Sequence, residues 1–91
     1  MTKAAMERLL KSEFFHEVAE VVKAWDYYLT VGDRESADEM MHKWDMAKFA
    51  LEYITGNLYG FSRNGETYGI VNERDYNERI LIGDSVKGVI K

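Results

Sequence analysis

The sequence predicts an α+β fold in which a long antiparallel helical hairpin packs on a small C-terminal antiparallel β-sheet of three or four strands. Apolar residues recur at helical spacing over residues 3–29 and 34–55, and a short Gly-Asp turn separates the two stretches. After Gly56 the pattern changes to short, β-rich segments with closely spaced glycines. Helices followed by strands in this order are typical of α+β proteins.

Composition indicates one globular domain over residues 1–91, with the helical hairpin in 1–55 and the strands in 56–91. The chain is 46% hydrophobic and 13% aromatic, which is enough for a modest core. It has no cysteine, so disulfides and zinc–thiolate sites are excluded. Its net charge of −4 disfavours nucleic acid and anionic membranes as partners. Because no signal-like or membrane-spanning apolar run is present, we expect a cytoplasmic protein.

The first helical stretch begins near Thr2 or Lys3 and runs to about Leu29. Its broad apolar face suits burial against a second helix. Serine favours caps over helix interiors, so Ser12 leaves open a short first helix followed by another from Ser12. The opposite face carries an acidic stripe of Glu13, Glu17 and Glu20. The apolar face contains Leu10, Phe14, Val18, Val21, Val22, Trp25, Tyr28 and Leu29.

The second helical stretch, Arg34–Thr55, has apolar residues on two separate faces. Gly32 can end the preceding helix, Asp33 or Ser36 can cap this one, and Gly56 can end it. The first face is formed by Met40, Trp44, Ala47, Leu51 and Ile54. The second face is formed by His42, Met46, Phe49 and Tyr53, with Asp38, Asp45 and Glu52 beside it.

Each of these two faces needs a partner. We expect the first face to pack on the preceding helix. We predict that Met46, Phe49 and Tyr53 pack on the sheet, because a sheet must be covered and no other helix is available. The alternative is a row of anchors for another protein or a second copy of the chain, since helix-in-groove recognition uses this spacing.

The C-terminal part predicts a β-hairpin followed by further strands. Asn64-Gly65 indicates a type I′ turn, in which both residues have positive φ. The polar stretch 72–78 predicts a loop or one helical turn, and Gly83–Ser85 a second turn. The expected strands are Leu58–Ser62, Thr67–Val71, a central strand Arg79–Ile82 and a fourth strand Val86–Ile90.

Three features are candidate sites besides the second face of Arg34–Thr55. The acidic stripe can dock on a basic surface or simply be a solvated helix face. Asp38, His42 and Asp45 share the i, i+4, i+7 spacing of metal ligands, but no further ligand is evident, so we interpret them as an ordinary exposed face. The tripeptides Tyr59–Phe61 and Tyr68–Ile70 can stack on single-stranded bases, or their glycines can relieve crowding against a helix.

No phosphate-binding loop, nucleophile elbow or metalloprotease pair occurs in the sequence, so we expect no enzyme activity, cofactor or metal. We hypothesise a non-enzymatic interaction module, a regulator or inhibitor that docks on a larger basic protein. Small proteins of phages and mobile elements often have this composition. The alternatives are a homodimeric structural module that uses the second face, and a nucleic-acid binder that uses the aromatic hairpin. The candidate partner-binding residues are Glu13, Glu17, Glu20, Asp38, His42, Asp45, Met46, Phe49 and Tyr53.

Overall fold

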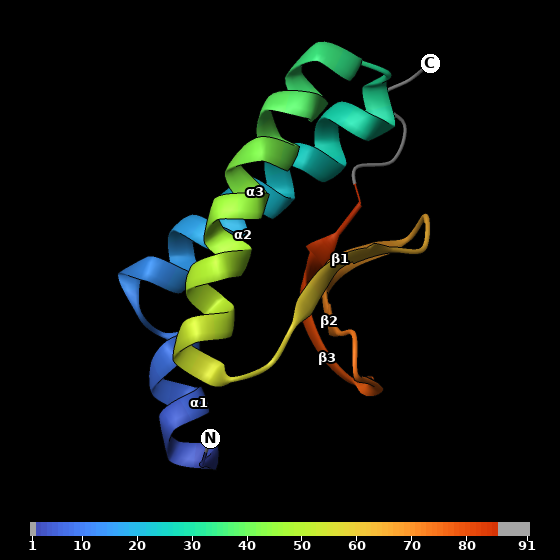
Figure 1. Cartoon of the computed structure of the whole chain (residues 1–91). Helices are drawn as coiled ribbons and strands as arrows, with labels where there is room; N and C mark the ends of the chain where they lie inside the picture. The colour runs from blue at the N-terminus through green and yellow to red at the C-terminus, as the bar shows by residue number, and fades with distance from the viewer. Residues whose placement is uncertain (1, 86–91) are drawn as a thin grey trace.

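The computed structural model describes residues 2–85, which form three helices followed by a three-stranded antiparallel sheet (Figure 1). The predicted α+β fold is confirmed. The predicted fourth strand, Val86–Ile90, lies outside the described residues. The helices are α1 (Lys3–Leu10), α2 (Glu13–Val31) and α3 (Arg34–Thr55), and the strands are β1 (Tyr59–Arg63), β2 (Thr67–Asn72) and β3 (Asp75–Asp84).

Local signals set the helix ends. The Ser12 hydroxyl accepts a hydrogen bond from a backbone N–H of α2 at 3.1 Å, so the N-terminal stretch divides into two helices. Gly32 (φ 78°) and Gly56 (φ 74°) end α2 and α3 in the left-handed conformation. Asp33 caps α3, and hydrogen bonds from the side chain and the backbone of Ser36 lower the pKa of its carboxyl group.

The turn between β1 and β2 differs from the predicted type I′ turn. Three residues, 64–66, connect the strands, and Gly65 (φ 89°) has a positive φ whereas Asn64 does not. The Asn64 Oδ1 atom accepts hydrogen bonds from the backbone N–H groups of Glu66 (2.9 Å) and Thr67 (2.8 Å). An Asn side chain that satisfies two backbone donors stabilises a longer loop, so the chain does not need the two-residue turn.

The prediction of a loop or helical turn over 72–78 is wrong, and so is the predicted turn that begins at Gly83. β2 continues through Asn72 and β3 begins at Asp75, while β3 extends to Asp84. The Asn72 Oδ1 atom accepts a hydrogen bond from the Arg74 N–H at 2.9 Å, which stabilises the tight connection. Residues 75–77 are exposed, so the strand begins without the polar–apolar alternation that identifies strands in a sequence.

β2 is the central strand and β3 lies at an edge, which corrects the predicted central position of Arg79–Ile82. Phe61 and Ile70 are register partners, and Ile70 also pairs with Ile80, so the three side chains share the sheet face that packs on the core. On that face the Phe61 ring stacks on Trp25 of α2, with ring centroids 4.2 Å apart. The fully buried core residues include Val18, Val22, Leu51, Tyr59 and Ile70.

The glycine beside Ile70 serves a different purpose from the one expected. A Cβ atom at Gly69 would collide with the backbone carbonyl oxygen of Ile80. Gly69 therefore permits the close approach of β2 and β3. It does not create space for a helix.

The second apolar face of α3 does not pack on the sheet, which overturns that prediction. Met46, Phe49 and Tyr53 are 77%, 79% and 92% exposed. The sheet lies along the side of the helical hairpin where α2 contacts β2 and β3, while α3 meets it at β1 (Figure 1). The reason is that the broad apolar face of α2 serves two neighbours, α3 and the sheet, so α2 supplies the cover that the sheet requires.

Two alanine substitutions on α3 test the assignment of its faces. Leu51 is 1% exposed, so Leu51→Ala should lower the free energy of unfolding by about 2–5 kcal/mol, because it leaves a cavity in the core. Phe49→Ala on the exposed face should change it by less than about 0.5 kcal/mol. Urea denaturation of both variants measures the difference. Equal losses would contradict the orientation of α3.

Candidate interaction surface

Met46, Phe49 and Tyr53 form a continuous exposed row, which we call the α3 ridge. Their i, i+3, i+7 spacing aligns them along one side of the helix. His42 is also exposed and lies one turn before Met46 on the same line. Single exposed apolar residues are common on protein surfaces, but contiguous exposed rows mark sites of interaction. The ridge is therefore the main candidate site of the described residues.

On one side of the ridge lies a shallow apolar groove between α2 and α3, which we call the interhelical groove. Its volume is about 330 Å³. Ala47 and Ala50 leave space in it because they are small, and Met46 belongs to both the groove and the ridge. The groove is lined by Phe14, Glu17, Val18 and Val21 of α2 and by Lys43, Met46, Ala47 and Ala50 of α3.

On the other side of the ridge lies an acidic row on α3. Asp38, Asp45 and Glu52 are exposed and follow one another at intervals of seven residues, so they lie along one line of the helix. Asp45 and Glu52 line a second hollow together with Phe49. Lys48 lies in the same hollow, but its Nζ atom pairs with a carboxylate oxygen of Glu73 at 3.3 Å. Because Lys48 is paired with Glu73, it is not paired with the carboxylates of this row, which are exposed beside the ridge.

A second acidic row lies on α2, across the interhelical groove. Glu17 lines the groove, and Glu13 and Glu20 are exposed four and three residues away on the same side of the helix. The structure thus brings Glu17 and Met46 to one groove, and Asp45 and Phe49 to the adjoining hollow. The sequence pattern did not identify the groove residues as surface residues. Phe14, Val21 and Ala47 lie on apolar faces that were expected to be buried, and Ala50 was assigned to neither apolar face of α3.

The candidate metal-ligand set Asp38, His42 and Asp45 is spread along the exposed side of α3. Within residues 2–85, no group of three or more His, Cys, Asp or Glu side chains is arranged to hold a metal ion. All three side chains are exposed on α3. Asp38 and Asp45 lie beside the ridge, and His42 lies in line with it.

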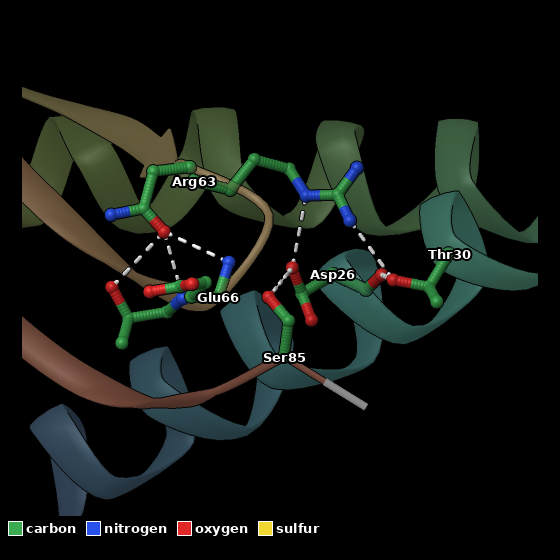
Figure 2. Close-up of polar contacts among 7 residues, drawn as sticks. Asp26, Thr30, Arg63, Glu66 and Ser85 are labelled. Carbon is green, nitrogen blue, oxygen red and sulfur yellow. Dashed lines mark hydrogen bonds and ion pairs between the residues drawn. The ribbon is translucent and has the colours of Figure 1, made fainter. Parts of the chain in front are cut away.

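A buried polar cluster, which the sequence analysis missed, attaches the sheet to α2 (Figure 2). Asp26 of α2 is completely buried, and its Oδ1 atom accepts hydrogen bonds from Arg63 Nε (2.9 Å) and Ser85 Oγ (3.0 Å). The Arg63 guanidinium also donates to the Thr30 hydroxyl at 2.9 Å. The Asp26 Oδ2 atom is buried without a hydrogen-bond partner among the described residues. The sequence feature that could have indicated this cluster is Asp26 itself, an acidic residue that directly follows Trp25 in a helix rich in apolar residues.

The aromatic rings of the β-hairpin are turned toward the core. Tyr59 is 0% exposed and Tyr68 is 6% exposed. Burial raises the pKa of both phenols above the ordinary value, and the hydrogen bond between Tyr59 and Glu78 raises that of Tyr59 further. Nucleic-acid modules need rings that are open to bases. The burial of these rings therefore argues against the nucleic-acid alternative.

Over residues 2–85, no helix combines the length and the apolar character needed to cross a membrane.

No known family model matches the chain, and no curated protein or solved structure is significantly similar to it. The candidate function must therefore be inferred from the chemistry of the surface.

Breaking the Asp26–Arg63 pair should be costly. In Arg63→Met the buried carboxylate keeps the Ser85 hydroxyl but loses its cation. We expect the free energy of unfolding to fall by about 3 kcal/mol, because a buried charge is left uncompensated. Lys48→Met, which removes the more exposed pair with Glu73, is the control, with an expected loss below about 1 kcal/mol. Similar losses in chemical denaturation would show that the buried pair has no special importance.

The buried tyrosines predict a loss of stability at alkaline pH. A phenol whose pKa is raised in the folded state keeps its proton longer than in the unfolded chain, so its contribution is complete below about pH 10 and disappears as the pH rises through the folded pKa. The free energy of unfolding should therefore decrease above about pH 10. The decrease should be shallower in Tyr59→Phe than in Tyr53→Phe, whose ring is exposed. Identical slopes in denaturation at several pH values would contradict this assignment.

Proposed function

We propose that this protein is a non-enzymatic interaction module that docks on a larger protein through the outward side of α3. The observation that carries the proposal is the exposure of the ridge, whose three large side chains are at least 77% exposed on successive turns of one helix. Exposed apolar rows bordered by polar residues are typical of protein-binding surfaces. The spacing of the ridge is that of anchors in helix-in-groove recognition.

A regulator or inhibitor that acts on a basic protein fits this surface best. The ridge has carboxylates on both sides, and such a border selects partners with basic residues around an apolar centre. The ridge also lies on a regular helix, so few side chains need to be ordered on binding beyond the anchors themselves. We also propose a cytoplasmic location, since a chain without cysteine needs no oxidising compartment to fold.

A homodimer formed through α3 is the second candidate, because the same ridge can pair with its copy. In an antiparallel pairing, the row of Asp38, Asp45 and Glu52 on one subunit would face the same row on the other. Like charges placed opposite one another oppose association. The acidic border therefore favours a different, basic protein.

Removal of the ridge rings tests the proposed function. The wild-type chain and Phe49→Ala/Tyr53→Ala are used to capture proteins from the native host, and the affinity of the captured protein is then measured after purification. We expect the double variant to bind more than about tenfold more weakly, because central aromatic anchors dominate binding energy. Leu81→Ala is the matched control, since Leu81 is also exposed (67%) but belongs to the sheet.

Binding that is equally strong in the wild type and the double variant would refute the proposed use of the ridge. A protein that sediments as a dimer, and becomes monomeric in the double variant, would replace the proposal with the homodimer.

A further inference from the structure

We infer that the partner contributes an amphipathic helix with Lys or Arg on both flanks, which lies along α3 with its apolar side chains in the interhelical groove and against the ridge. This inference rests on the proposed function and adds the chemistry of the partner to it. Two properties of the surface carry it, the shape of the groove and the distribution of charge around it.

The groove has the shape that receives a helix. It follows the seam between two packed helices, and a third helix on such a seam reproduces the packing of a helical bundle at interaxial distances of about 8–10 Å. Ala47 and Ala50 let large side chains of the partner enter between Phe14 and Met46. A further hollow shares Phe14 with the groove and reaches Ile54. From Lys43 to Ile54 the surface extends about 16 Å, or three helical turns.

The charge around the groove selects a basic helix. The α2 row (Glu13, Glu17 and Glu20) borders the groove through Glu17. The α3 row (Asp38, Asp45 and Glu52) lies on the far side of the ridge. A helix that covers both the groove and the ridge therefore has carboxylates on both sides. A second copy of this chain would bring the same two acidic rows. Phosphate groups of a nucleic acid or of an anionic membrane would also be repelled. A partner helix with basic flanks has complementary charge on both sides.

Lys43 lines the groove opposite Glu17, and Arg8 lines the further hollow that reaches Ile54. A basic partner helix must leave a neutral or acidic residue beside Lys43, so this residue opposes binding of a uniformly basic helix. Reversing its charge should therefore strengthen the binding of such a helix. Lys48 has less influence because Glu73 already pairs with it.

A displayed library of helical peptides tests the inference. Each peptide has the same leucine-rich face at i, i+3, i+4 and i+7, and its flanking positions vary among Lys, Arg, Glu and Ser. Selection against the full chain should enrich Lys and Arg flanks, and a purified basic-flanked peptide should bind at least about tenfold more tightly than its glutamate-flanked counterpart. That preference should shrink as salt is added.

Charge reversal on the protein provides the decisive comparison. Glu17→Lys/Asp45→Lys should invert the preference of the selected peptides. Glu66→Lys/Asp75→Lys makes the same charge change at exposed residues of the sheet region, in the β1–β2 turn and at the start of β3, and should leave the preference unchanged. Lys43→Glu should tighten binding of the basic-flanked peptide severalfold. Peptide affinity is read by fluorescence anisotropy, and circular dichroism checks that each variant is folded.

Equal binding of peptides with basic and acidic flanks would overturn the inference, and so would the absence of any selected helix. The proposed function would then still be judged separately by whether native capture depends on Phe49 and Tyr53. A tighter association of the chain with itself than with any peptide, abolished by Met46→Glu in sedimentation, would make a second copy the occupant.

Discussion

The buried contact between Asp26 and Arg63 is the constraint on which the arrangement of the layers depends (Figure 2). A carboxylate with no access to water is stable only where donors reach it, so Arg63 at the end of β1 and Ser85 just after β3 must both lie against α2. Both edge strands of the sheet are thereby attached to α2. The stacked Phe61 and Trp25 rings extend the same contact with apolar surface.

The position of the sheet under α2 explains why α3 has an uncovered side. α2 has α3 along one side of its apolar face and the sheet along the other, so α3 needs only one buried face, which contains Trp44 and Leu51. The side of α3 that bears the ridge therefore faces solvent. Its exposed rings are not needed for packing of the core, so this surface is available for recognition.

The fold also brings together charges that are distant in the sequence. Glu17 and Asp45 belong to different helices, and the short link at Gly32 and Asp33 folds α2 back on α3. The α3 row therefore lies beside the ridge, and the α2 row lies across the interhelical groove from it. Lys48 also lies in this border, but its positive charge is already paired with Glu73. The resulting apolar centre with acidic sides selects a basic partner by charge and an amphipathic one by shape.

The sequence by itself determined what depends on neighbouring residues. Gly32 ends α2, and Asp33 and Gly56 set the limits of α3, because caps are local properties. The exposed rows of charge follow from helical spacing, which is also local. Only the tertiary structure decided which apolar face of α3 is buried, that β2 is the central strand, and that Asp26 pairs with Arg63. Periodicity shows that a helix has two apolar faces, but burial depends on which distant surface packs on each face, and here the sheet packs mainly on α2 and meets α3 at β1.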